Sequence, residues 1–289
     1  MKSAATVFLA AFLALSASWA GFVLAPQLQL GRQPQVKPSG MDGLYPVARP
    51  GLAQQGAQVY RSLGCVYCHS QSVGQEGTIC ELVLVDAGTN PPATLSALAQ
   101  IDKELAKPFT LGGLPKVIKI VRDVPTAVPM IKTLKAAGAT AEVKVSAQGP
   151  DIARGWGLRR SVAHDYAYDE TVQIGTRRSG PDLANVGLTK PALDWQLLHL
   201  YAPSSVVPAS TMPPYRFLFE QRKVTRTPSL EALQLTGEFA PPAGYEIVPT
   251  HEARALAAYL VSLRVDVPLD EAPFTSLAAP SPATNSPAK

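Results

Sequence analysis

The chain contains one Cys-x-x-Cys-His sequence, formed by Cys65-Val66-Tyr67-Cys68-His69. This is the attachment sequence of a c-type haem, whose two vinyl groups each bond to one of the thiols. The imidazole directly after the second cysteine then lies under the iron and supplies the proximal ligand. We therefore predict one covalently bound haem c, attached through Cys65 and Cys68, with His69 as a ligand of the metal.

Other site chemistries fit this sequence less well. A zinc site needs a second pair of cysteine or histidine residues at ligand spacing, but Cys80 is the remaining cysteine and the other histidines are scattered. A thioredoxin-like pair stands at a strand–helix junction and is not followed by histidine. A chance pair and a disulfide stay open as alternatives. We interpret Cys80 as a small buried residue rather than a reactive thiol.

The composition favours a loop-rich globular protein. Hydrophobic residues make up 46% of the 289 residues, which is enough for a core, and 27 Pro with 21 Gly argue against a helical bundle. The formal net charge is only +4, and no basic stripe is interleaved with aromatic residues. Nucleic acid is therefore not expected as a partner.

An uncharged apolar run from Ala4 to Ala25 follows Lys2 and is ended by Pro26. Its length of about 22 residues is enough to span a bilayer as a helix. Cleavage after Ser18-Trp19-Ala20 as a signal peptide is the alternative, but the apolar run continues past that site. We predict that residues 1–26 are a membrane anchor or signal, that residues 4–25 contact lipid, and that residues 27–50 are a linker. The body of the protein is expected on the periplasmic or outer side of the inner membrane.

Residues 73–150 differ from their surroundings and are predicted to form an inserted small α/β domain. The sequence predicts strands over Cys80–Val85 and Ala141–Val145 and helices over Thr94–Leu105, Leu114–Val121 and Val128–Ala137. The order of these elements and the sequence LKAAGATAEVKV resemble the C-terminal domain of the ribosomal stalk protein. Because a fold does not carry a function with it, we interpret this domain as a spacer or docking insert.

Two helices frame the rest of the chain. A short amphipathic helix is predicted from Gly51 to Leu63, directly before Cys65, and a second from Thr250, its N-cap, to Leu263. This arrangement is similar to class I cytochromes c, in which the C-terminal helix crosses the N-terminal one. We therefore expect a mainly α class I cytochrome c domain over residues 51–72 and 151–265, behind an N-terminal transmembrane helix. Residues 266–289 are rich in Ala, Pro and Ser and are predicted to be a disordered tail.

A Gly-Pro pair, Gly180-Pro181, follows the insert. In class I cytochromes c such a pair lies beside the proximal histidine, and the proline carbonyl accepts the imidazole N–H. By the same resemblance Leu183 packs on the porphyrin edge. Arg178, with Arg177 beside it, is a candidate for contacting the haem propionates, and solvated surface charge is the alternative.

The second axial ligand is predicted to be Met212. It lies in the proline-flanked loop Val206–Tyr215, whereas Met1 and Met41 precede the haem domain and Met130 belongs to the insert. A thioether is a weak, soft ligand that favours Fe(II) and raises the potential.

A histidine is the alternative to Met212. Either His164 or His199, the latter on a helix predicted over Pro191–Tyr201, would give bis-histidine ligation and a lower potential. Single histidines are more often structural residues than ligands.

Three segments together resemble the mono-haem cytochrome c subunit (subunit II) of cbb3-type cytochrome c oxidases. They read VYRSLGCVYCHSQ, SVAHDYAYDETVQIGTRRSGPDLANVG and DWQLLHLYAPSSVVPASTMPPYRFLF. The resemblance implies a covalent haem on Cys65 and Cys68 with His69 and Met212 as axial ligands. It also implies electron transfer from a donor cytochrome c to the haem–copper catalytic subunit of a terminal oxidase, so the chain would not be catalytic alone.

The chain departs from that family pattern at several places. The insert is extra, and His164-Asp165 and Glu170-Thr171 stand where the family usually has Gly-Glu and His-Pro. These changes affect the partner interface more than the haem. The alternatives are a free-standing anchored cytochrome c carrier or the small subunit of a nitric oxide reductase. An enzyme such as a haem peroxidase would need a displaceable distal ligand and usually a second haem.

Overall fold

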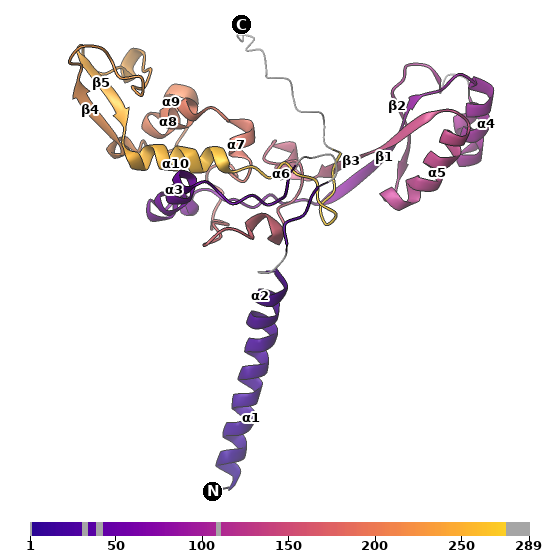
Figure 1. Cartoon of the computed structure of the whole chain (residues 1–289), viewed down its shortest axis with the longest axis horizontal. Coiled ribbons are helices and arrows are strands. Elements are labelled where there is room, and N and C mark those ends of the chain that lie inside the picture. Colours follow the sequence, from indigo (N-terminus) through magenta and orange to yellow (C-terminus); the bar gives the residue numbers. More distant parts are fainter. Residues whose placement is uncertain (1, 31–33, 39–42, 108–110, 276–289) are drawn as a thin grey trace.

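The computed structural model of the chain describes residues 2–30, 34–38, 43–107 and 111–275. Met41 and residues 276–289 of the predicted tail lie outside the described residues. Within them the chain has three parts, namely a long N-terminal helix, a mainly helical domain that carries Cys65–His69, and an α/β unit. Figure 1 shows the α/β unit on the opposite side of the helical domain from the hairpin of β4 (Phe219–Lys223) and β5 (Tyr245–Pro249).

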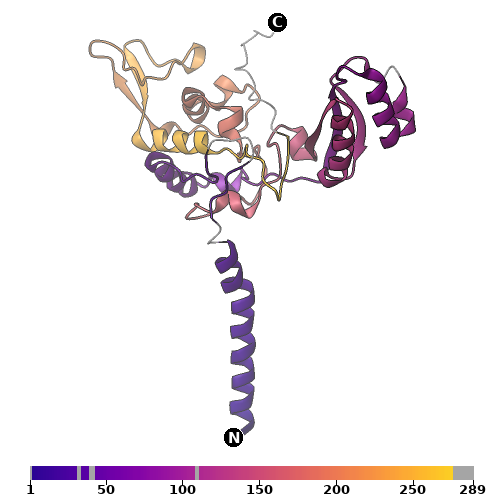
Figure 2. The ribbon, with the colours of Figure 1, turned by 45° about the vertical axis from the view of Figure 1, so that its right-hand side comes forward.

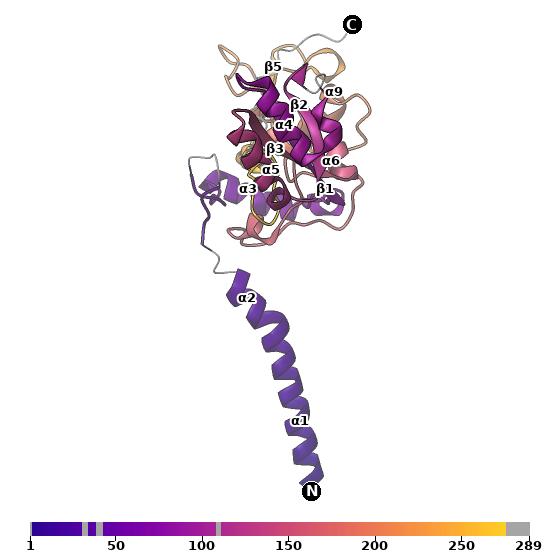
Figure 3. The same ribbon diagram turned by 90° about the vertical axis from the view of Figure 1, so that its right-hand side faces the viewer.

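The N-terminal helix stands apart from the rest of the protein, as Figure 1 and Figure 3 show. It consists of α1 (Lys2–Trp19), the π-helical turn η1 (Ala20–Leu24) and α2 (Ala25–Leu30). Within its segment Ser3–Gln29, an 18-residue window has a mean hydropathy of 2.1, and none of the residues in that window is buried. By length and composition it is able to cross a membrane.

The helix does not end with the apolar run at Pro26 but continues to Leu30, into the segment predicted to be a linker. Proline lacks an N–H, and its ring crowds the carbonyl four residues earlier. The wider π turn precedes Pro26, with the N–H of Ala25 bonded to the carbonyl of Ala20. Such a turn shifts the backbone pairing so that a proline can follow without ending the helix.

The helical domain is built around two packed helices, α3 (Gly51–Ser62) and α10 (His251–Ser262). They approach closely at Gly56, where an added Cβ would lie 1.9 Å from the carbonyl oxygen of Ala255. Tyr60 and Tyr259 pack beside this crossing, with ring centroids 5.3 Å apart. The predicted N-cap is confirmed, since the side chain of Thr250 accepts a hydrogen bond from the N–H of Ala253.

Short elements complete this domain, and they are α6 (Pro150–Ala153), η5 (Ala163–Tyr166), α7 (Val186–Thr189), α8 (Leu193–Tyr201), α9 (Pro203–Val206) and η6 (Arg216–Leu218). An antiparallel hairpin of β4 (Phe219–Lys223) and β5 (Tyr245–Pro249) lies between η6 and α10, with η7 (Gly237–Phe239) in its loop. One apolar core joins α3, α8, α10 and the hairpin. The sequence pattern did not predict the hairpin.

The inserted unit has its own core and its own sheet. The strands β1 (Gly77–Asp86), β2 (Lys116–Val121) and β3 (Thr140–Gln148) are antiparallel in the order β2-β1-β3. The helices α4 (Pro91–Ile101) and α5 (Val124–Ala136), with η3 (Lys103–Ala106), pack on it as Figure 2 shows. Cys80 is buried in this core, as the sequence predicted.

The predicted helix over Leu114–Val121 is wrong, since Lys116–Val121 forms strand β2. Its apolar residues are mostly β-branched, and short apolar runs do not distinguish helix from strand by periodicity alone. Pairing with β1 decides the outcome, with Cys80 opposite Val121 and Glu81 opposite Ile120.

The chain beyond Val265 is also more ordered than predicted. Val267, Leu269, Ala272 and Phe274 are buried, and the N–H of Thr275 donates to the carbonyl of Val145 on β3 at 2.8 Å. The predicted disordered tail therefore does not include residues 266–275.

A buried ion pair fastens the linker and this C-terminal segment to the helical domain. The guanidinium of Arg159, which is fully buried, bonds to the carboxylate of Asp165 at 2.8 and 3.0 Å. The hydroxyl of Tyr45 donates to the same carboxylate at 2.6 Å, and Arg159 Nε donates to the carbonyl of Val267 at 2.6 Å. Asp165, which departs from the family pattern, is thus an interior residue here.

Candidate haem site

Cys65 and Cys68 lie directly after α3. Gly64 ends the helix in the left-handed conformation, with φ of 72°, and a 3₁₀ turn η2 (Cys65–Tyr67) follows. The N–H of His69 bonds to the carbonyl of Cys65 at 3.0 Å, so the motif folds back on itself. Burial raises the pKa of the Cys65 thiol to about 11, whereas Cys68 is exposed.

The ring of His69 is oriented by a backbone carbonyl. Its Nδ1 lies 2.9 Å from the carbonyl oxygen of Pro181, which assigns the ring proton to Nδ1. The other nitrogen, Nε2, then carries a lone pair suited to a metal. The contact predicted between the Gly-Pro pair and His69 is present.

The segment from Gly175 to Pro181 lies closely over the Cys-x-x-Cys-His turn. A Cβ at Gly180 would lie 2.3 Å from Cε1 of His69, and one at Gly175 would lie 2.3 Å from the His69 carbonyl oxygen. The N–H of Gly180 donates to the carbonyl of Cys68 at 2.9 Å. The chain therefore forms a close cradle for the His69 ring, and these residues fit a c-type haem held by two thiols and one imidazole.

Leu183 and Met212 reach the same side of the domain. Leu183 is buried in the core against which Cys65, Val66 and Met212 pack. The N–H of Leu183 donates to the carbonyl of Ser70, the residue after His69, at 2.8 Å. Of the two methionines that the structure describes, Met130 packs in the insert core and Met212 packs here. The structure thus places Cys65, Leu183 and Met212 at one core, and their roles toward a haem stay a prediction.

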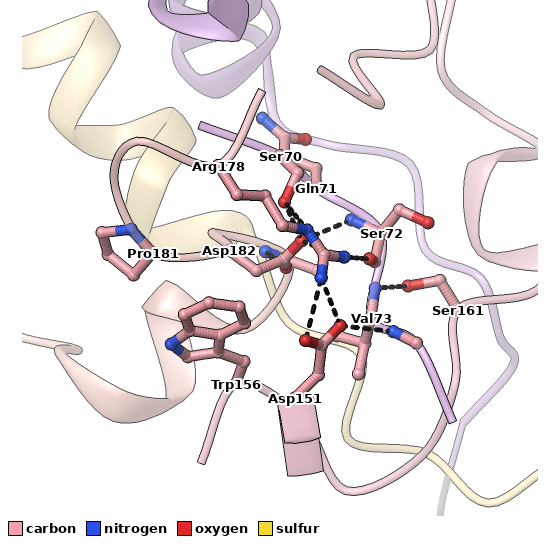
Figure 4. A network of polar contacts seen from close by, with 12 residues as sticks. Ser70, Gln71, Ser72, Val73, Asp151, Trp156, Ser161, Arg178, Pro181 and Asp182 are labelled. Carbon is pink, nitrogen blue, oxygen red and sulfur yellow. Dashed lines mark hydrogen bonds and ion pairs between the residues drawn. The ribbon is translucent and has the colours of Figure 1, made fainter. Parts of the chain in front are cut away.

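Arg178 is bound within the protein (Figure 4). Its Nη1 lies 2.8 Å from both carboxylate oxygens of Asp151, its Nε donates to Ser70 Oγ at 3.0 Å, and its Nη2 donates to the carbonyl of Ser72. Its guanidinium also lies 5.6 Å from the centroid of Trp156. The predicted contact with a haem propionate therefore competes with an ion pair that Arg178 already makes.

Asp182 and Asp151 bind the stretch of chain that follows His69 in the sequence. The carboxylate of Asp182 accepts hydrogen bonds from Ser70 Oγ at 2.5 Å and from the N–H of Ser72 at 2.8 Å (Figure 4). Asp151 accepts the N–H of Gly74 at 2.7 Å. Asp182 could have been expected from its place next to Gly180-Pro181, but nothing in the sequence marks Asp151 as the partner of Arg178.

The two histidine alternatives to Met212 lie in different surroundings. The Nε2 of His164 is 3.2 Å from the carbonyl oxygen of Tyr45, in the buried group around Asp165. His199 stacks on Trp195, and its pKa is lowered first by burial and then by the electrostatic effect of the nearby His69, while a backbone hydrogen bond with Pro203 acts in the opposite direction. Of the two, His199 is the one near His69. Across the described residues, no group of three or more His, Cys, Asp or Glu side chains could hold a metal ion.

Comparison with known proteins adds one finding. Residues 151–237 match the family model described as cytochrome C oxidase, mono-heme subunit/FixO. No curated protein matches the chain. The match includes Gly180, Pro181, Leu183 and Met212, but it does not include the Cys-x-x-Cys-His motif. It does not include the insert either, and the resemblance of the insert to the ribosomal stalk protein is unsupported. The matched segment supports the mono-haem subunit family of cytochrome c oxidases, which implies one haem and a place in an oxidase complex.

Proposed function

We propose that this chain is the membrane-anchored, mono-haem electron-transfer subunit of a cbb3-type oxidase. It takes electrons from a donor cytochrome c and passes them to the haem–copper catalytic subunit. The observation that carries this proposal is the hydrogen bond between His69 Nδ1 and the Pro181 carbonyl, made across the Gly180 cradle. It joins the attachment motif to the segment that matches the oxidase family.

In this proposal, haem c is held by thioether bonds to Cys65 and Cys68 and by axial bonds to His69 and Met212. The haem supplies a site that accepts and releases one electron. The protein fixes the ligands, because Pro181 orients the imidazole and the Arg178–Asp151–Asp182 network holds the chain behind it. The thioether of Met212 favours Fe(II), which suits a carrier of relatively high potential.

The N-terminal helix supports an anchored subunit. The segment Ser3–Gln29 is able to span a bilayer, and we propose that it stays attached and contacts lipid. Lys2 then lies on the cytoplasmic side and the haem domain on the periplasmic or outer side. The inserted α/β unit, which has a separate core, would serve as a spacer or docking element.

The test uses the detergent-extracted full chain. A haem-stained denaturing gel should show covalent haem that is lost in Cys65→Ser and Cys68→Ser together. The near-infrared sulfur-to-iron charge-transfer absorption should disappear in Met212→Ala and persist in Met130→Ala, the matched control in the insert. Co-purification with a haem–copper subunit would support the oxidase role. Covalent haem without such a subunit would instead favour a free-standing carrier, and no covalent haem would overturn the proposal.

A further inference from the structure

His199 on α8 has a buried ring nitrogen without a hydrogen-bond partner in the described part of the chain. The atom is Nδ1. The ring is held in place by Trp195, with which it stacks at a centroid distance of 4.9 Å and an interplanar angle of 9°. Buried polar atoms are nearly always hydrogen-bonded in folded proteins. A backbone hydrogen bond with Pro203 also acts on this imidazole, but its Nδ1 has no partner in the described residues. A fixed ring with this unpaired buried nitrogen points to a partner from outside the polypeptide for Nδ1.

The other buried unpaired side-chain atoms in the described residues lie elsewhere. Arg49 Nε belongs to a side chain that lines a cavity of about 170 Å³, where water is a ready partner. The hydroxyl of Tyr60 and the amide of Gln71 lie near each other at the α3–α10 crossing. His199 differs from these because it lies close enough to His69 for the two imidazoles to interact electrostatically.

The position of His199 connects it to both proposed axial ligands. Its neighbours Leu197 and Leu200 belong to the core on which Cys65 and Met212 pack. The carbonyl of Leu200 accepts the N–H of Tyr215, which anchors the loop that carries Met212 to the end of α8 at 2.8 Å. His199 therefore borders the region between the attachment motif and the Met212 loop.

We infer that His199 is a positioning residue of the haem site, whose Nδ1–H donates a hydrogen bond to a haem propionate. This rests on the proposed covalent haem. A propionate is a carboxylate, and a hydrogen bond to a charged acceptor is stronger than one between neutral groups. Arg178, the sequence-predicted propionate contact, is already paired with Asp151, so the propionate needs another donor. Met212 remains the axial ligand, and His199 does not bind the iron.

The variant experiment compares His199→Leu and His199→Gln with the wild-type holoprotein. In His199→Leu the carboxylate bands of the redox-induced infrared difference spectrum should shift. The midpoint potential should fall, because a less neutralised propionate favours Fe(III). His199→Gln retains an N–H donor and should restore part of both effects. Covalent haem and the near-infrared sulfur-to-iron absorption should be retained in both variants.

The control is His251→Leu, which removes an exposed imidazole bonded to Gln55. This variant should change neither the carboxylate bands nor the midpoint potential. Unchanged carboxylate bands and potential in His199→Leu would overturn the inference. Loss of the near-infrared absorption would also overturn it, since His199 would then act on Met212 or on the iron. If the wild type carries no covalent haem, the proposed function fails first, which the haem-stained gel distinguishes.

A second measurement needs no variant, and it tests the hydrogen bond between His199 and the propionate even if His199→Leu does not accumulate. In ferrous protein with ¹⁵N-labelled histidine, the Nδ1–H of His199 should show a nuclear Overhauser effect to a propionate methylene of the haem. An effect only to the methyl group of Met212, or rapid exchange of this proton with water, would overturn the inference.

Discussion

Gly180 is the residue that determines how closely the chain approaches the ring of His69. An added methyl group would lie 2.3 Å from Cε1 and 2.7 Å from Nδ1 of that ring. Both the position of the imidazole and its bond to Pro181 depend on this space. A substitution here tests the cradle without removing any ligand.

We predict that Gly180→Ala displaces the His69 ring or the Pro181 carbonyl and costs about 1–3 kcal/mol of folding stability through overpacking. The yield of covalent haem should fall, and the midpoint potential of the remaining holoprotein should change. Haem staining and a redox titration measure these effects. Gly77→Ala is the control, since a Cβ there meets nothing within 4 Å. Normal haem and potential in Gly180→Ala would contradict the cradle.

The thiol of Cys65 gives a pH-dependent prediction for the haem-free protein. Burial raises its pKa to about 11 from an ordinary value of 9.0. The thiolate is the reactive form, so alkylation of Cys65 should be slow at neutral pH and rise about tenfold per pH unit up to that pKa. Because the folded pKa is raised, the stabilisation from the buried thiol is present below pH 9.0 and lost as the pH rises through about 11.

Mass spectrometry after iodoacetamide treatment at a series of pH values measures this rate. The Cys68→Ser variant isolates Cys65 from its neighbour, and Cys65→Ser gives the rate for the exposed Cys68. Equal rates for the two thiols at neutral pH would contradict the burial of Cys65. Cys80, buried in the insert, should react slowly in both variants.

At the scale of elements, the packing of α3 on α10 depends on a single glycine. A Cβ at Gly56 would lie 1.9 Å from the carbonyl oxygen of Ala255 and 2.7 Å from Cβ of Tyr259. Because the first contact is with backbone, the two helices would have to move apart. The polar and aromatic residues beside the crossing, including Tyr60, would move with them.

Gly56→Ala is therefore expected to lower the free energy of unfolding by about 1–3 kcal/mol, in spite of the better helix propensity of alanine. Gly51→Ala lies on the same helix, where a Cβ meets nothing within 4 Å. It should be neutral or stabilising by up to about 1 kcal/mol. Denaturant unfolding of both variants makes the comparison. A stabilised Gly56→Ala would show that the helices do not pack in this way.

At the scale of the whole molecule, the insert is attached mainly at the ends of its first and last strands. Its first and last strands pair there, with Gly77 opposite Gln148, and the N–H of Glu76 donates to the carbonyl of Gln148 at 2.9 Å. The insert core and the core of the helical domain share no residue. Beyond this attachment, Thr275 bonds to Val143 and Val145 of β3.

We predict that replacing residues 77–148 by a short glycine linker leaves haem attachment, the near-infrared absorption and the midpoint potential unchanged. The physical reason is that Leu183 belongs to the other core and that Cys65 and Met212 pack against it. Leu98→Asp in the full chain is a companion variant, because it places a charge in the insert core while leaving the attachment intact. Loss of covalent haem in both proteins would show that the haem site needs a folded insert.

Several features of this protein follow from short stretches of sequence. The helix before Cys65, the long apolar helix, and the Thr250 cap of α10 were all predicted, because each depends on neighbouring residues. The contact of Pro181 with His69 and the place of Met212 came from a family resemblance that the segment 151–237 supports.

Long-range contacts decided the rest. Lys116–Val121 is a strand because β1 pairs with it, and residues 266–275 are ordered because Arg159 and β3 bind them. Arg178 pairs with Asp151, 27 residues away, and bonds to Ser70, the residue after His69. Hydrogen bonds and packing between distant segments form only when the chain has folded. The sequence by itself therefore determined which residues are candidates for a haem site, and the tertiary structure decided which residues contact them.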